Sequence, residues 1–541
     1  MVSKQAGVGE SRADSAAQAV APDQAEQAAL SFAGVEPKAQ VPARIFGSFV
    51  EHLGRCVYGG IYEPGHPSAD EDGFRQDVLD LVKELGVTCV RYPGGNFVSG
   101  YRWEDGTGPR ELRPVRRDLA WHATESNQMG IDDFYRWSRK AGTEIMLAVN
   151  MGTRGLAEAL DELEYVNGAP GTALADRRVR NGIPEPMGIS MWCIGNEMDG
   201  PWQVGHMNQE EYAAAVERAA HAMKLVEPGL ELVACGSSSA HMPTFGSWER
   251  TVLTQAYEHV DFVSCHAYYY ERGAASLQDF LASSEDMEAF IATVVAAADD
   301  ARAVNKGSKD IALSFDEWGV WNQEVWNGEE NERQQAKGLH TEPWPQAPHQ
   351  LEDIYTVADA VVEGSLMITL LSHADRVRSA SRAQLVNVIA PIMAEEGGPA
   401  WKQTIFYPFA EAAQRVKGSI VVPRVSSPKL ETSSYGRVDA LKAVASWDQE
   451  SGSGVLLMVN RDVESAHQVR VDVGALAGGA GDAAVRVSGA KVLYDADIHA
   501  TNSAQEPYRV KPVELPVQVE ADGQLAFELP AVSWAAIELS R

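Results

Sequence analysis

Short apolar segments separated by amphipathic stretches recur along residues 43–416. Eight of these segments have the length and composition of buried strands: Arg44–Phe49, Val87–Tyr92, Glu144–Asn150, Gly188–Gly195, Leu230–Cys235, Val260–His266, Ile311–Phe315 and Arg376–Gln384. Strands that are apolar on both faces are typical of parallel sheets covered on both sides. The pattern therefore predicts alternating strands and helices in an α/β fold.

Helical periodicity fills most of the intervals between these strands. In Asn208–Val226, Asn208 can cap the helix, Glu211 completes a capping box, and Pro228-Gly229 ends it. Similar patterns occur at Asp72–Leu85, Ile131–Ala141, Ser284–Val304 and Leu351–Ser372. A doubly wound open sheet would also alternate strands and helices. Eight strands, with no Gly-x-Gly-x-x-Gly turn after the first, favour a closed (β/α)8 TIM barrel.

After about Lys417 the helical periodicity stops, and short segments with a two-residue alternation replace it. They include Val469–Val473, Val517–Val519 and Trp534–Leu539, with Gly- and Asp-rich turns such as Ala477–Asp482 between them. Residues 417–541 are therefore predicted to form a C-terminal β-sandwich of the jelly-roll-like kind, to which residues 26–42 could add a strand. Residues 1–25, rich in Ala, Gln, Ser and Asp, are predicted to be a flexible N-terminal tail.

Composition narrows the choice of partners and compartment. A net charge of −30 repels phosphate backbones and anionic lipids, so we expect neither nucleic acid nor a membrane as a partner. The 5 cysteines include no Cys-x-x-Cys pair, which indicates buried thiols and not a disulfide framework or a zinc site. Residues 1–24 lack the apolar segment of a secretory signal, and no apolar run reaches the ~20 residues of a membrane span. A cytoplasmic protein is expected.

Two of the predicted strands end in glutamate: Glu197 follows the fourth strand, and Glu317 ends the seventh. Tryptophans accompany both, namely Trp192, Trp202, Trp318 and Trp321. The C-terminal ends of barrel strands form the active-site face. Two carboxylates there suit glycosidic bond cleavage, in which one protonates the leaving oxygen and the other attacks or stabilises the anomeric carbon. A lone glutamate could equally cap a helix or pair with an arginine, but the paired placement beside tryptophans favours catalysis.

Four longer blocks of sequence carry a resemblance to a known family. They are Phe46–Gly54, Arg91–Gly100, Trp192–Trp202 and Gln384–Pro391. With these blocks the chain resembles the glycoside hydrolase family 51 α-L-arabinofuranosidases from about Ile45 to the C-terminus. The resemblance implies a retaining, exo-acting enzyme that removes terminal non-reducing α-L-arabinofuranosyl residues from arabino-oligosaccharides by double displacement. It implies that Glu197 is the general acid/base and Glu317 the nucleophile.

The resemblance also implies a set of substrate-binding residues: Glu51, Arg91, Asn96, Asn196, Tyr268 and Gln384 around the sugar, with Trp121 and Trp321 as walls. Arg91 could keep Glu317 ionised, and Tyr268 could hydrogen-bond Glu317. The sequence alone does not choose among Tyr268, Tyr269 and Tyr270. No cofactor and no metal are expected, because no two histidines near the barrel-top loops have ligand spacing with an acidic partner. Relatives commonly form hexamers, which implies a homo-oligomer.

Two features depart from the family pattern. Ser381-Arg382-Ala383-Gln384 stands where many relatives have Cys-Leu-Ala-Gln. In a continuing strand Arg382 would share a face with Gln384 and need a partner acid, so we expect a bulge or an early strand end there. The loop Asn322–His349 is long and polar, and we expect it to border the leaving-group side, with Trp344 stacking on the second sugar.

Other functions remain open on the residues alone. A β-xylosidase or an endo-glucanase of the same barrel clan would use the same pair of carboxylates. A non-catalytic carbohydrate-binding protein is a further alternative, although Glu197, Glu317 and Asn196 together argue against it. A phosphate-handling barrel isomerase would need a Gly-rich anion site after the seventh and eighth strands, and Gln384–Pro391 is not one.

Overall fold

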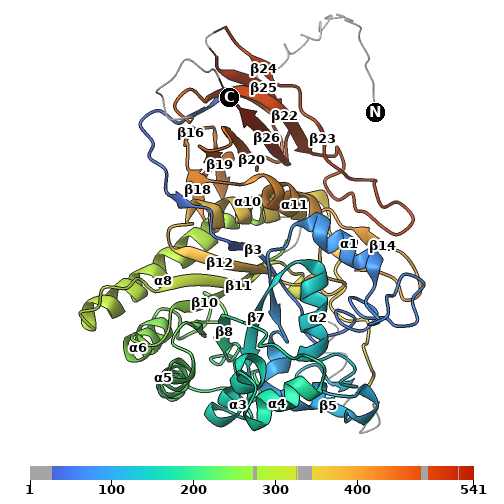
Figure 1. Cartoon of the computed structure of the whole chain (residues 1–541). Coiled ribbons are helices and arrows are strands. Elements are labelled where there is room, and N and C mark those ends of the chain that lie inside the picture. The colour runs from blue at the N-terminus through green and yellow to red at the C-terminus, as the bar shows by residue number, and fades with distance from the viewer. Residues whose placement is uncertain (1–26, 272–276, 325, 327–343, 477–484, 522) are drawn as a thin grey trace, which may run out of the picture.

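The computed structural model describes residues 27–271, 277–324, 326, 344–476, 485–521 and 523–541 (Figure 1). Eight parallel strands close into a barrel in the order β10-β11-β12-β3-β4-β7-β8-β9. They are β3 (Arg44–Phe49), β4 (Cys89–Tyr92), β7 (Glu144–Val149), β8 (Met191–Ile194), β9 (Glu231–Ala234), β10 (Phe262–Tyr269), β11 (Ala312–Val320) and β12 (Val377–Arg382). The predicted barrel is confirmed: six of the eight predicted segments contain a whole barrel strand, and the other two overlap β10 and β11. The expected tail at 1–25 and the turn at Ala477–Asp482 lie outside the described residues.

Helices surround the barrel (Figure 1). They are α1 (Gln76–Leu85), α2 (Ile131–Ala141), α3 (Leu156–Asn167), α4 (Ala173–Arg180), α5 (Gln209–Val226), α6 (Ser247–Ala256), α7 (Leu277–Leu281), α8 (Ser284–Val304), α10 (Val357–Ser372) and α11 (Phe406–Arg415). The predicted capping box of α5 is present, because Asn208 Oδ1 accepts from the Glu211 amide at 2.9 Å and Glu211 Oε2 accepts from the Asn208 amide at 3.1 Å. Helices α1 and α10 begin several residues later than predicted, α10 directly after its cap Thr356.

Strands β10 and β11 extend well past their predicted ends at His266 and Phe315. They stay paired to the top of the barrel, where His266 faces Glu317 in the register. The prediction that Glu317 ends its strand was therefore wrong. Pairing with β12 continues to Trp318 and pairing with β10 continues to Val320, which holds β11 extended beyond Glu317. The longer strands raise this side of the barrel wall and keep Glu317 on rigid backbone.

The C-terminal part forms two packed sheets. The five-stranded sheet has the order β16-β1-β21-β25-β24, and the seven-stranded sheet the order β2-β15-β19-β20-β26-β22-β23. The strands are β1 (Gln27–Ser31), β16 (Arg424–Ser426), β21 (His467–Asp472), β24 (Gln518–Val519) and β25 (Leu525–Leu529), and then β2 (Ala39–Gln40), β15 (Ser419–Val421), β19 (Leu441–Asp448), β20 (Ser453–Asn460), β22 (Arg486–Leu493), β23 (Val513–Glu514) and β26 (Ser533–Ser540). Alternate side chains of both sheets share one apolar core, among them Leu30, Val471, Phe527, Ala445, Met458 and Ile537. The predicted β-sandwich is confirmed.

Smaller paired elements complete the fold: the hairpins β5 (Arg116–Asp118)–β6 (Ala123–Glu125) and β17 (Lys429–Thr432)–β18 (Gly436–Asp439), the strand pair β13 (Ile392–Ala394)–β14 (Ala400–Lys402), and the short 3-10 helices η1 (Asn96–Gly100), η2 (Trp103–Gly106) and η3 (Arg110–Leu112). The 5 cysteines are buried and free, as predicted. Among the described residues no helix is both long and apolar enough to span a membrane.

Helices α10 and α11 lie between the barrel and the sandwich (Figure 1). The central strands β19, β20 and β26 of the seven-stranded sheet are buried on both faces, because the second face packs on these helices, with Val455, Leu457 and Trp534 in the barrel's apolar core. Gly364 of α10 permits a close approach, since a Cβ there would lie 2.2 Å from Trp534 Cδ1. The sandwich thereby supports the helix that leads into β12.

Candidate active site

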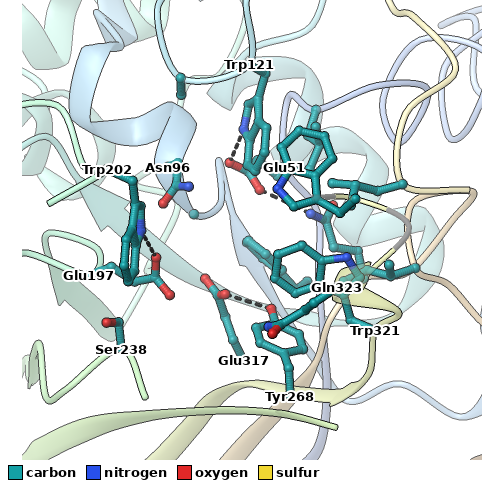
Figure 2. Close-up of a pocket in the computed structure, with 18 of the residues that line it drawn as sticks. Glu51, Asn96, Trp121, Glu197, Trp202, Ser238, Tyr268, Glu317, Trp321 and Gln323 are labelled. Atoms are coloured by element: carbon teal, nitrogen blue, oxygen red, sulfur yellow. Dashed lines mark hydrogen bonds between the residues drawn. The ribbon is translucent and has the colours of Figure 1, made fainter. Parts of the chain in front are cut away.

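A cavity of about 730 Å³ opens at the C-terminal end of the barrel strands (Figure 2). Eight of the ten predicted site residues line it: Glu51, Asn96, Trp121, Glu197, Tyr268, Glu317, Trp321 and Gln384. The other two, Arg91 and Asn196, are buried and hydrogen-bonded to each other, and Arg91 also bonds Glu317. The structure therefore brings all ten predicted residues together.

Glu317 is held by one cation and one hydroxyl. Arg91 Nη1 donates to its Oε1 at 2.8 Å. The Tyr268 hydroxyl donates to its Oε2 at 2.7 Å (Figure 2). Tyr269 points elsewhere and donates to Asp286 at 3.0 Å. Burial raises the pKa of Glu317, and the nearby cations His266 and Arg91 oppose that rise. Both oxygens of Glu317 are thus fixed at the base of the cavity.

Glu197 follows β8 by three residues, in a left-handed turn with a φ of 44°. Trp202 Nε1 donates to its Oε2 at 2.7 Å, and His266 Nδ1 lies 2.9 Å from its Oε1 (Figure 2). One oxygen of Glu197, one of Glu317 and a ring nitrogen of His266 all lie within 4.8 Å of one another. Retaining glycosidases hold their two carboxyl groups about 5–5.5 Å apart, whereas inverting enzymes need about 6.5–9.5 Å. The spacing fits double displacement.

His266 lies among three acids. Its Nε2 is 3.1 Å from Asp316 Oδ1, and its Nδ1 is 3.5 Å from Glu317 Oε2 as well as close to Glu197. Burial works against a charge on His266, but the three carboxylates outweigh it and raise the His266 pKa well above its usual range. Arg91 Nε lies 3.6 Å from Asp316. Arg91 and His266 therefore lie among three acids at the base of the site.

Glu51 lies across the cavity from Glu197 (Figure 2). Its Oε1 accepts from the Phe97 amide at 2.9 Å and from Trp121 Nε1 at 2.8 Å, and its Oε2 accepts from Gln384 Nε2 at 3.1 Å. Burial raises the pKa of Glu51 to about 8, and the charge of Glu317 adds to the effect. At neutral pH this acid is therefore protonated and can donate a hydrogen bond to a neutral, hydroxyl-rich ligand.

Aromatic rings form the upper walls. Trp321 contacts Tyr268 edge-to-face at 5.1 Å between ring centroids, and Trp121 contacts Trp326 in the same way at 5.9 Å. Trp202 is 52% exposed beside Glu197 and presents a free face to the cavity. These rings suit stacking on sugars. The predicted residue set did not include Trp202 or Trp326, although Trp202 stands five residues after Glu197.

Neither His266 nor Asp316 belongs to the predicted set of site residues. The available signal for Asp316 was its position directly before Glu317. Neighbouring strand residues point to opposite faces, so the sequence alone argued against a shared site. The pairings of β11 with β10 and with β12 both contain register shifts of the β-bulge type. In this irregular segment Asp316 and Glu317 both reach His266.

Trp344 does not line the cavity. Its ring lies 3.9 Å from that of His122, which does, and Arg117 lies 5.0 Å from the Trp344 ring centre. The carbonyls of Trp344 and Pro345 accept from Thr124. The expected direct contact of Trp344 with the second sugar is therefore replaced by a contact that supports His122. Residues 327–343 of the same loop lie outside the described residues.

Two groups of side chains in the described part of the chain have the proximity of metal ligands. The first is Glu197, His266 and Glu317, whose polar atoms are already engaged in hydrogen bonds with Trp202, Asp316, Arg91 and Tyr268. The second is Glu217, His221 and His259 on the barrel exterior. The two histidine rings of that group stack at 12° and 4.6 Å, so their in-plane lone pairs do not converge on one ion. Neither group supports a metal assignment.

Comparison with known proteins gives family matches over most of the chain. Residues 81–286 match the model of the α-L-arabinofuranosidase 1 domain, and residues 316–533 match that of the α-L-arabinofuranosidase C-terminal domain. An intracellular exo-α-(1→5)-L-arabinofuranosidase of Bifidobacterium longum is 68% identical, over 94% of this chain and 91% of that protein. An exo-α-(1→6)-L-arabinofuranosidase of the same species is 52% identical, over 93% of this chain and 95% of that protein.

Solved structures agree. A family 51 α-L-arabinofuranosidase from Bifidobacterium longum superposes with a TM-score of 0.90 at 66% identity, covering 95% of this chain and 100% of that one. The arabinose complex of an α-L-arabinofuranosidase from Thermotoga maritima superposes with a TM-score of 0.81 at 30% identity, covering 95% of this chain and 100% of that one. The similarity thus spans both the barrel and the sandwich.

Proposed function

The chain belongs to glycoside hydrolase family 51, the α-L-arabinofuranosidases, and on that premise we propose that it is an exo-acting enzyme that releases terminal non-reducing α-L-arabinofuranosyl residues with retention. It is a glycoside hydrolase by family. The observation that carries the proposed reaction is the pair Glu197 and Glu317, whose oxygens lie within 4.8 Å of each other at the base of the cavity. That spacing supports attack by a carboxylate.

In the proposed mechanism Glu317 is the nucleophile. Arg91 and Tyr268 each bond one of its oxygens, which stabilises the carboxylate and fixes its approach to the anomeric carbon. The carboxylate displaces the leaving oxygen and forms a glycosyl ester. Water then breaks this ester from the opposite side and restores the original configuration.

Glu197 is proposed as the general acid/base. It protonates the leaving oxygen in the first step and takes a proton from water in the second. Trp202 and His266 each hold one of its oxygens, so the carboxyl group has a fixed orientation. Asn196 accepts from Arg91 at 2.6 Å and donates to Asn96 at 3.2 Å, and we propose that its amide also binds the sugar 2-hydroxyl.

Glu51 and Gln384 are proposed to bind the remaining hydroxyls of the furanose. They bond each other and line the same wall as Trp121 and Trp321. A net charge of −30 imposes no penalty on a neutral sugar. The proposed mechanism uses protein side chains and water alone.

We further propose a preference for α-1,5-linked arabino-oligosaccharides and an intracellular, cytoplasmic location. Both proposals rest on relatives named intracellular exo-α-(1→5)-L-arabinofuranosidases, from Bifidobacterium longum at 68% identity and Streptomyces lividans at 50%. A location inside the cell suits short imported oligosaccharides. A homo-oligomer, a hexamer by family resemblance, remains a proposal that gel filtration with light scattering can test.

A substrate panel tests the proposed function. Arabinose release is measured from α-1,2-, α-1,3- and α-1,5-linked oligosaccharides, beside aryl α-L-arabinofuranoside, aryl β-xyloside and a soluble β-glucan. We expect rapid cleavage of the α-1,5 series and of the aryl arabinofuranoside, with arabinose as the first product. Faster cleavage of the xyloside or the glucan would indicate the β-xylosidase or endo-glucanase alternative. Tight binding without turnover would indicate a carbohydrate-binding protein.

A further inference from the structure

Arg382 is a buried cation two residues before Gln384, and it ends the last barrel strand. The guanidinium is 2% exposed and bonds Glu363 of α10, with Nε 3.0 Å and Nη2 2.5 Å from Glu363 Oε1. The predicted early strand end is confirmed, because β12 stops at Arg382. The partner acid that an inward arginine would require is also present, in a helix that follows β11.

The third nitrogen of the guanidinium bonds only backbone. Arg382 Nη1 donates to the carbonyls of Ala383 at 2.5 Å and Gln384 at 3.4 Å, and also to that of Ile389. The Gln384 amide donates to the same Ile389 carbonyl at 3.1 Å. Arg382 therefore bonds both ends of the turn at residues 383–389. Two residues of that turn, Gln384 and Ile389, line the catalytic cavity.

Glu363 connects this cluster to the strand that carries Glu317. Its Oε1 accepts from the Val320 amide at 3.3 Å, and the Val320 carbonyl accepts from the Tyr355 hydroxyl at 2.7 Å. The Arg382 guanidinium lies over the Tyr355 ring at 5.5 Å. Gly319 leaves room for the pair, because a Cβ there would lie 3.1 Å from Glu363 Oε1. The ion pair therefore ties the end of β11 to the turn after β12.

Stability alone does not account for such a pair. Removing two charges from water costs free energy that their attraction often fails to offset, and well-packed apolar replacements are frequently neutral or stabilising. An apolar pair has no hydrogen-bond donors, so it could not hold the carbonyl groups of Ala383, Gln384 and Ile389 in one arrangement, whereas the arginine does. The geometry points to a role in shaping the turn that presents Gln384.

We propose that Arg382, anchored by Glu363, is a positioning residue that sets the place of Gln384 opposite Glu51. The inference rests on the proposed function, because its effect is read in arabinofuranoside hydrolysis. Gln384 Nε2 reaches Glu51 at 3.1 Å, so a shift of the turn by a fraction of an ångström breaks this contact and misplaces the sugar. Arg382 itself does not touch the substrate.

A double-mutant cycle tests the proposal. We expect Arg382→Met to lower kcat/KM on an aryl arabinofuranoside by about tenfold to hundredfold. Because Arg382 acts through Gln384, adding Arg382→Met to Gln384→Ala should cost less than about threefold further. Arg382→Lys, which keeps the charge but cannot bond Glu363 and three carbonyls together, should recover part of the loss.

The matched control is Arg44→Met. Arg44 also lies on a barrel strand and bonds two acids, Glu144 and Glu231, at 2.6 Å each, but at the opposite end of the barrel. Arg44→Met should lower Tm and leave kcat/KM close to the wild-type value, both alone and in the Gln384→Ala background. All rates are taken per titrated active site, well below each variant's Tm, so that unfolding does not enter.

Three outcomes would overturn the positioning role: wild-type kcat/KM in Arg382→Met, a full second loss when Arg382→Met is added to Gln384→Ala, or a loss of kcat/KM in Arg44→Met as large as that in Arg382→Met. If Arg382→Met does not fold, Arg382→Lys replaces it in the same cycle, with an expected loss of about threefold to tenfold. A wild-type enzyme that releases no arabinose would refute the proposed function instead, so the two failures are distinguishable.

Discussion

At the scale of single residues, the two proposed catalytic carboxylates differ in their partners. Glu317 accepts from a guanidinium and a phenol, and both contacts favour its ionised form. Glu197 accepts from the Trp202 indole and faces the cavity. A nucleophile needs fixed oxygens and a free charge, whereas an acid/base needs access to the leaving group and to water. The surroundings of the two residues match these separate requirements.

Glu317→Ala should lower kcat on an activated aryl arabinofuranoside by roughly 10³-fold or more. Removing the carboxylate leaves space on the face of the sugar that Glu317 occupies, so external azide should restore part of the turnover and give the β-configured glycosyl azide. The product is identified by NMR. The α-configured azide, or activity that persists without azide, would show that Glu317 is not the nucleophile.

Glu51 makes stability depend on pH in a predictable direction. Its pKa rises from the ordinary value of 4.5 to about 8 in the folded protein. Between these values the folded state keeps a proton that the unfolded state has lost, so the free energy of unfolding falls as pH rises through that window. We expect Glu51→Gln, which stays neutral, to gain Tm relative to wild type at pH 8 and much less at pH 5.

The measurement for Glu51 is thermal unfolding at both pH values. Glu210→Gln, on the exposed side of α5, is the control and should show the same small Tm offset at both. An equal offset for Glu51→Gln at pH 5 and pH 8 would mean that Glu51 is ionised throughout. The raised pKa also implies that burying Glu51 beside Glu317 lowers the free energy of unfolding at alkaline pH.

At the scale of elements, the β5–β6 hairpin and the segment that begins at Trp344 hold each other. Trp344 stacks on His122 and on Arg117, and Thr124 bonds the carbonyls of Trp344 and Pro345. His122 belongs to the cavity wall together with Leu119 and Ala120 from the same hairpin. Support from outside the hairpin therefore decides where this part of the wall lies.

Trp344→Ala should lower kcat/KM on α-1,5-linked oligosaccharides by roughly tenfold, because His122 loses the ring that holds it in the cavity wall and the contact of that wall with the leaving group weakens. Hydrolysis of a small aryl arabinofuranoside should fall much less, because its leaving group barely reaches this wall. His122→Ala is the matched variant and should show the same selectivity. Equal losses on both substrates, or a change in oligomeric state alone, would contradict the proposal that this wall contacts the leaving group.

At the scale of the whole molecule, α10 couples the sandwich to the active site. It packs on β19, β20 and β26 on one side and on β11 and β12 on the other, and it carries Glu363. The seven-stranded sheet contributes Trp534 to the apolar core of the barrel. The sandwich is therefore a structural support of the catalytic barrel as well as a second domain.

Gly364→Ala should lower the free energy of unfolding by about 1–3 kcal/mol, because the added methyl group overlaps Trp534 and the packed helix and sheet must separate. Chemical denaturation gives the value directly. Gly229→Ala is the control, since a Cβ at Gly229 meets nothing within 4 Å, and it should be close to neutral. Equal stability of both variants would mean that the junction is loosely packed.

The sequence by itself determined the elements and the types of chemical group. Short continuous apolar runs indicate strands that are buried on both faces, as barrel strands are. The start of α5 is indicated by Asn208 and Glu211, which form a capping box three residues apart. These features depend on local spacing, which a linear pattern records. The positions of Glu197 and Glu317 after two predicted strands marked them as a candidate catalytic pair, and the resemblance to family 51 named the other eight site residues.

Only the tertiary structure decided which groups meet. Glu51 and Gln384 are 333 positions apart, and Arg382 and Glu363 belong to different elements that barrel closure brings together. The length of β11 depends on pairing with β10 and β12. The strand end predicted from the sequence was therefore too early, and Glu317 lies within the strand. Asp316 and Glu317 both reach His266. Such contacts depend on closing the sheet, because a side chain's partners across the barrel lie on other strands and leave no periodic signal along its own.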